Sequence, residues 1–123
     1  MAKRIAIIED EVSISKLYEF KFIKEGYDVK TAFNGKDGLE LVEKFLPNVI
    51  LLDLLMPEMN GEEMLTKLRE TDWGKDIKVI ILTNVSRQEA PESMANLEIS
   101  RYIVKAEMTA SQVAEVVKEV LLR

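Results

Sequence analysis

The chain has 123 residues, with 17 lysines and arginines against 22 aspartates and glutamates, so its formal charge is −5. This length suits one domain, and a composition of 47% hydrophobic and 32% charged residues excludes a disordered chain, which would lack apolar surface to offset its ordering entropy. The acidic balance argues against direct nucleic-acid binding, and the lack of Cys and His excludes disulfides, thiolate nucleophiles, Cys/His zinc sites and Ser-His-Asp triads.

Five short runs rich in β-branched residues predict strands. In chain order they are Ile5–Ile8, Val29–Ala32, Val49–Leu52, Val79–Leu82 and Tyr102–Val104. Three of these runs are continuously apolar, which is typical of parallel strands that are covered on both faces. The segments between them are long enough for crossover helices, so the sequence predicts a doubly wound α/β fold in which residues 1–123 form a single domain.

Five helices are predicted between the strands and after the last one. Gly26 ends the first with a left-handed cap, and Pro47 ends the second because proline cannot continue a helix. The other three begin at capping-box patterns, which are Asn60-x-x-Glu63, Ser86-x-x-Glu89 and Thr109-x-x-Gln112. Pro91 falls inside the helix that begins at Ser86, so we expect that helix to start late or to kink. An apolar stripe marks the last helix, at Val113, Val116, Val117, Val120 and Leu121.

Polar side chains follow four of the five strands. They are Glu9, Asp10 and Glu11 after the first strand, Asp53 after the third, Thr83 after the fourth and Lys105 after the fifth. In a parallel sheet these positions share the carboxyl edge, where open α/β folds bind ligands. We therefore expect side chains that are distant in the sequence to converge on one pocket.

The acidic residues Glu9, Asp10 and Asp53 would repel one another unless a cation neutralises them. Without His or Cys, an oxygen-liganded divalent ion is the simplest solution, and Mg²⁺ is the expected one. The alternative is a solvated acidic loop that binds nothing.

Asp53 lies between Leu52 and Leu54 in a strongly apolar stretch, where an unpaired carboxylate is costly. The functional interpretation is a nucleophile that accepts a phosphoryl group, and the alternative is a turn or helix-cap aspartate. Lys105 could reach the phosphoryl oxygens as a point charge, although a lysine at a strand end is usually solvated. Thr83 offers a hydroxyl to the same oxygens, but threonine favours strands in any case.

Taken together, these residues resemble the receiver domain of bacterial two-component response regulators. The likeness extends from about Lys3 to Leu122. Each motif alone is weak evidence for the family. The separations of 43, 30 and 22 positions between Asp10, Asp53, Thr83 and Lys105 are together highly specific for it. The matching set is Glu9-Asp10-Glu11, Asp53 with Met56-Pro57-x-x-Asn60-Gly61, Thr83, Tyr102 and Lys105. The resemblance implies a flavodoxin-like fold with a five-stranded parallel sheet in the order 2-1-3-4-5.

The resemblance also implies phosphotransfer to Asp53 from a phosphohistidine of a sensor histidine kinase or a histidine phosphotransfer protein. The implied Mg²⁺ ligands are Asp10, Asp53, Glu9 through water, and the backbone carbonyl of Leu55. The only chemistry implied is the domain's own phosphotransfer and slow self-dephosphorylation, with no separate enzymatic activity.

In the implied switch, Lys105 contacts the phosphoryl group, Thr83 moves toward it, and Tyr102 rotates into the vacated space. The change would alter the surface of the fourth helix, fifth strand and fifth helix, which could also support a homodimer. An ordinary strand aromatic is the alternative role for Tyr102.

Several positions depart from the family pattern. Ala106 follows Lys105 where the family commonly has a cis proline, so the loop geometry is not predictable from the pattern. Asn84 stands in place of a small residue after Thr83 and is expected to narrow access to the phosphoryl site. Leu55 and Val85 occupy positions that often carry polar groups near the hydrolytic water, so we expect a long-lived phosphoryl group.

The first helix raises a separate question. If Ile14, Leu17, Tyr18 and Phe22 face the core, then Ile23 lies on the opposite side with Phe20 beside it. These two side chains are either scattered surface apolars, which are common, or a docking patch for a phosphodonor helix.

Three rival functions share parts of this pattern. A flavodoxin-like cofactor binder needs a phosphate-cradling loop, which Glu9-Asp10-Glu11 would repel. A haloacid-dehalogenase-type phosphatase needs a second aspartate where Leu55 stands. A receiver-like interaction module that is not phosphorylated remains an alternative because of Asn84 and Ala106. The apolar runs are too short to span a bilayer and no signal peptide is recognisable, so we expect a cytoplasmic protein without membrane contact.

Overall fold

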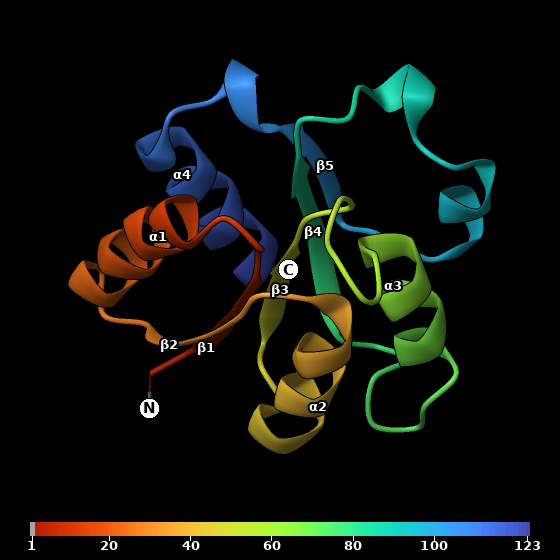
Figure 1. Cartoon of the computed structure of the whole chain (residues 1–123). Helices are drawn as coiled ribbons and strands as arrows, with labels where there is room; N and C mark the ends of the chain where they lie inside the picture. The colour runs from red at the N-terminus through yellow and green to blue at the C-terminus, as the bar shows by residue number, and fades with distance from the viewer. Residues whose placement is uncertain (1) are drawn as a thin grey trace.

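All five predicted strands form, each within one residue of its predicted ends. The structure, a computed structural model, describes residues 2–123 (Figure 1). Its strands and α-helices are β1 (Arg4–Ile8), α1 (Val12–Lys24), β2 (Asp28–Ala32), α2 (Gly35–Phe45), β3 (Val49–Leu52), α3 (Gly61–Arg69), β4 (Lys78–Thr83), β5 (Arg101–Val104) and α4 (Ala110–Leu121). Three short 3₁₀-helices complete it, namely η1 (Arg87–Glu89), η2 (Glu92–Asn96) and η3 (Lys105–Glu107).

The strands form one parallel sheet in the order β2-β1-β3-β4-β5, which confirms the predicted fold class. Helices α1 and α4 lie on one side of the sheet, and α2 and α3 lie on the other (Figure 1). Alternate residues of β1 enter the two cores, since Ile5 and Ile7 pack with α1 and α4, whereas Ala6 and Ile8 pack with α2 and α3. Burial on both faces explains why the central strands are continuously apolar.

The predicted end of the first helix is confirmed at Gly26. This residue has a φ of 97°, in the left-handed region that glycine adopts without strain. Its N–H donates to the carbonyl of Ile23 at 3.0 Å, and the N–H of Tyr27 donates to that of Phe22 at 3.1 Å. These two bonds form a Schellman motif, and the Tyr27 ring packs edge-on against Phe22 as the accompanying apolar contact.

The prediction of five helices is wrong in the segment between β4 and β5, where the described chain forms η1 and η2 instead of an α-helix. Ser86 does cap as predicted, because its hydroxyl accepts the N–H of Glu89 at 3.3 Å. Pro91 then ends the helix after three residues. Ala90 before it is extended (φ −63°, ψ 143°), since a residue that precedes proline avoids the helical region.

One expected core position of α1 is also wrong. Tyr18 and Phe22 are buried as predicted, whereas Leu17 is 57% exposed and Ser15 is buried in its turn of the helix. Helix α1 therefore exposes four large apolar side chains, which are Val12, Leu17, Phe20 and Ile23. Within residues 2–123, none of the helices combines the length and apolar character that crossing a bilayer requires.

Candidate functional site

The ends of β1 and β3 bring two acidic side chains together. Ile8 and Leu52 are paired in the sheet, so Glu9 and Asp53 each follow the last residue of neighbouring strands. The N–H of Asp53 donates to the carbonyl of Ile8 at 3.0 Å and extends the pairing by one step. Glu9 and Asp53 are both buried, which is unusual for carboxylates unless they are paired.

Lys105, which follows β5, supplies the pairing cation. Its Nζ donates to Oδ2 of Asp53 at 2.9 Å and also to Oε1 of Glu9. The side chains of Lys105, Glu9 and Asp53 are only 9%, 4% and 8% exposed. Residues 96 positions apart therefore meet at the carboxyl edge of the sheet, as the sequence predicted.

The second oxygen of each buried carboxylate binds the backbone. Oε2 of Glu9 accepts the N–H of Glu11 at 3.0 Å, and Oδ1 of Asp53 accepts the N–H of Leu55 at 3.2 Å. These bonds fix both carboxyl groups in orientation. The Leu55 side chain is 64% exposed beside the site.

Asp10 adds a third carboxylate. One oxygen each from Glu9, Asp10 and Asp53 lie within 4.8 Å of one another. The cluster has three acidic groups and one ammonium, so negative charge remains in excess. An oxygen-only donor set of this size fits a hard divalent cation such as Mg²⁺, which keeps several water ligands.

The pKa values of the paired groups reflect burial and charge. Burial raises the pKa of the Glu9 carboxyl above its ordinary value, and repulsion from Asp53 adds to this, against the hydrogen bonds from Lys105 and Glu11. Burial alone would lower the pKa of Lys105, but its hydrogen bonds to Glu9 and Asp53 prevail and raise it. Lys105 is thus a firmly held cation next to a carboxylate that gains from further positive charge.

Thr83 and Tyr102 lie on the neighbouring strands β4 and β5. Thr83 is fully buried, and its hydroxyl accepts the N–H of Val85 at 3.4 Å. The Tyr102 hydroxyl donates to the carbonyl of Val85 at 2.7 Å. The segment that follows Thr83 therefore also holds the Tyr102 ring.

Arg87 is a residue of this region that the sequence analysis missed. Its guanidinium lies 5.7 Å from the centre of the Tyr102 ring and donates to the Tyr102 carbonyl at 2.8 Å. It also forms an ion pair with Glu107 at 3.5 Å. The position of Arg87 depends on the short turn of η1, and the sequence predicted a longer helix there.

The loop after β5 differs from the family pattern in a specific way. The Lys105–Ala106 peptide is trans, and η3 begins at Lys105. The N–H of Ala106 donates to Oδ1 of Asn84 at 3.2 Å. The two departures, Asn84 and Ala106, are therefore in contact with each other, which the sequence analysis did not foresee.

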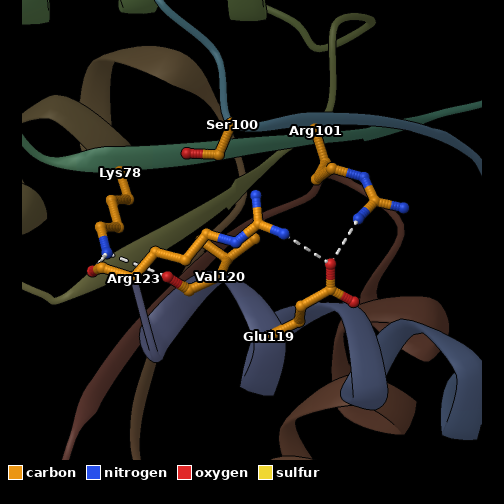
Figure 2. Close-up of a pocket in the computed structure, with 6 residues that line it drawn as sticks. All are labelled: Lys78, Ser100, Arg101, Glu119, Val120 and Arg123. Carbon is orange, nitrogen blue, oxygen red and sulfur yellow. Dashed lines mark hydrogen bonds and ion pairs between the residues drawn. The ribbon is translucent and has the colours of Figure 1, made fainter.

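A second polar hollow lies at the opposite edge of the sheet, near the starts of β4 and β5 (Figure 2). Lys78 donates to the carbonyls of Val120 and Arg123, so it closes the carboxyl end of α4. Glu119 pairs with Arg101 at 3.5 Å and with Arg123 at 3.1 Å. Because these charges bind one another, the hollow is explained as a helix cap and gives no sign of a ligand.

Comparison with known proteins decides the family. The family model described as response regulator receiver domain matches residues 5–118. The chain belongs to this family.

The receiver domain is 29% identical to a CheY-like response regulator receiver domain protein from Methanospirillum hungatei, with a TM-score of 0.89 over 98% of this chain and 94% of that one. It is 25% identical to the receiver domain of the Francisella response regulator 1452, with a TM-score of 0.86 over 98% of each chain. It is 30% identical to the response regulator TrrA of Thermotoga maritima, crystallised in complex with Mg²⁺-BeF, with a TM-score of 0.83 over 96% of this chain and 98% of that one.

Proposed function

We propose that residues 1–123 act as one phosphoacceptor receiver domain in which Asp53 takes a phosphoryl group from a phosphohistidine. The donor is a sensor histidine kinase or a histidine phosphotransfer protein. In the transfer, a carboxylate oxygen of Asp53 forms a bond to phosphorus while the phosphorus–nitrogen bond breaks, and the imidazole leaves with the electron pair. The ion pair of Lys105 with Asp53, set among further carboxylates, is the observation that carries this proposal.

The residues of the site have separate roles in the proposal. Lys105 holds the Asp53 carboxylate in place and provides a fixed positive charge for the incoming phosphoryl oxygens. Mg²⁺, when bound, would offset charge on the same oxygens. Asp10, Asp53, the carbonyl of Leu55 and, through water, Glu9 would hold it. The Mg²⁺-BeF complex of the Thermotoga relative supports this choice of ion.

The response is proposed to pass through Thr83 and Tyr102. A hydrogen bond from the Thr83 hydroxyl to the phosphoryl group would draw the end of β4 toward Asp53. The Val85 carbonyl, which holds the Tyr102 hydroxyl, would move with it. The surface that changes consists of η1, η2, β5 and α4, and it is the proposed site for an output partner or a second copy of this domain.

The proposal is tested by intact mass after incubation with acetyl phosphate and Mg²⁺. We expect a phosphoryl adduct on the wild type and on Asp72→Ala, a change at an exposed acid away from the site. We expect none on Asp53→Ala or on the wild type in EDTA. An adduct on Asp53→Ala would reject the acceptor, and no adduct on any protein would favour an interaction module that is not phosphorylated.

A further inference from the structure

The turn that carries Lys105 begins with backbone donors that its own short helix cannot satisfy. The first N–H groups of any helix lack intrahelical acceptors. Val104, at the cap position of η3, makes no side-chain capping bond. The N–H of Ala106 instead donates to the side-chain oxygen of Asn84 at 3.2 Å.

Asn84 is well placed for this bond because of the sheet register. Thr83 and Val104 are paired at the end of β4 and β5, so Asn84 and Lys105 are the next residues on adjacent strands. The Asn84–Ala106 bond spans 22 positions and continues the β4–β5 connection beyond its last rung. It ties the turn of Lys105 to the strand that ends in buried Thr83.

Lys105 requires a backbone that is held in place. Its four-carbon stem is flexible, and its ammonium must reach Glu9 and Asp53 at once. A change of the backbone at Ala106 would move the start of that stem. We propose that Asn84 is a positioning residue that holds the turn at Ala106 and so keeps the Lys105 ammonium on Asp53; its kinetic consequence rests on the proposed phosphoacceptor function.

Replacing Asn84 by leucine keeps the side-chain size and removes the acceptor. The net worth of one neutral hydrogen bond corresponds to a factor of about 2 to 12. We therefore expect Asn84→Leu to slow phosphorylation by acetyl phosphate by about three- to tenfold. Because Asn84 is exposed and bound Mg²⁺ offsets the charge of the carboxylates, the urea midpoint in excess Mg²⁺ should remain near that of the wild type, and the Mg²⁺ affinity should not fall. Thr66→Val, which removes a polar group at an exposed position of α3 outside the site and the switching surface, is the control and should leave the rate unchanged.

A double-mutant cycle separates this bond from other effects of the side chain. Ala106→Pro removes the N–H donor, so Asn84→Leu should cost no further rate in the Ala106→Pro background. An equal loss in both backgrounds would overturn the proposal. So would a fall in Mg²⁺ affinity, or a fall in the urea midpoint in excess Mg²⁺, that matches the fall in rate, since the role would then be structural.

A readout without phosphorylation keeps the inference separate from the proposed function. The NMR chemical shift of Lys105 Cε reports whether the ammonium is in contact with the buried carboxylates. It should move toward the signals of exposed lysines in Asn84→Leu, and stay in place in Thr66→Val. An unmoved Lys105 signal in Asn84→Leu would overturn the inference even where the wild type is phosphorylated. If the wild type takes up no phosphoryl group but the Lys105 signal still moves in Asn84→Leu, the proposed function is rejected and the inference about Asn84 stands.

Discussion

Replacing Lys105 with methionine tests whether this ammonium holds the acidic cluster together. The substitution keeps the length and apolar character of the stem and removes the charge. Glu9 and Asp53 are then left buried without their cation. We expect the variant to lose stability in EDTA and to recover a large part of it in Mg²⁺.

The magnitude follows from the geometry. Carboxylate oxygens that lie within 4.8 Å of one another repel by about 3 kcal/mol or more at an effective dielectric constant of about 20. Removing one partner of a buried ion pair costs about 3–5 kcal/mol. Since the cluster lies at the edge of the sheet, where water screens part of the repulsion, we expect a loss near 3 kcal/mol. Mg²⁺ at 100 times its Kd should restore about 2.7 kcal/mol.

Urea unfolding in EDTA and in excess Mg²⁺ measures these values, with an unchanged slope as the check that only stability has changed. Lys36→Met is the matched control, because it changes the net charge by the same amount as Lys105→Met. Lys36 is exposed, and none of the ion pairs among residues 2–123 includes it. The reasoning fails if Lys105→Met is as stable as Lys36→Met in EDTA, or if Lys105→Met gains no stability in excess Mg²⁺.

Three further predictions concern other parts of the molecule. The double change Leu55→Asn with Val85→Glu should speed loss of the phosphoryl group after the donor is removed, because polar groups there can orient water; an unchanged decay would reject this. Arg69 donates to five backbone carbonyls, so Arg69→Met should lower the free energy of unfolding by about 2–4 kcal/mol, against little change in the exposed control Arg123→Met. Burial raises the pKa of all three tyrosines above the ordinary value of 10, so the fold favours the neutral phenol; the free energy of unfolding should fall as the pH rises from 10 through the raised values, and tyrosinate absorbance should develop at a higher pH in the folded protein than in urea.

The fold was predictable because its signals are local and agree with one another. Continuous apolar runs specify buried parallel strands, and the residue that follows each run must lie at the carboxyl edge of the sheet. The positions of Asp53 and Lys105 follow from this rule without knowledge of the packing. Their ion pair confirms the convergence, whereas their chemical roles remain predictions for the experiments above.

The features that the sequence analysis missed depend on contacts between distant segments. Asn84 and Ala106 each appeared as a separate departure, and only the register of β4 and β5 makes them neighbours. Leu17 was assigned to the core from helical periodicity, but small Ser15 faces inward where α1 packs closely. Periodicity gives the face of a helix within about one residue position and cannot resolve such a rotation.

The missing helix between β4 and β5 has a physical consequence for the proposed switch. At its start, this segment is held by the Tyr102 hydroxyl on the Val85 carbonyl. At its end, Arg69 donates to the carbonyls of Leu97 and Glu98. Between these anchors, the two short 3₁₀-helices contain few backbone bonds and are held mainly by side chains, through the bonds of Arg87 to Tyr102 and of Ser93 to Glu62 and through buried Met94. Short 3₁₀-helices open at a lower free energy than an α-helix. In the proposed switch, we therefore expect a small displacement near Thr83 to rearrange the segment between the anchors while the sheet and the other helices keep their positions.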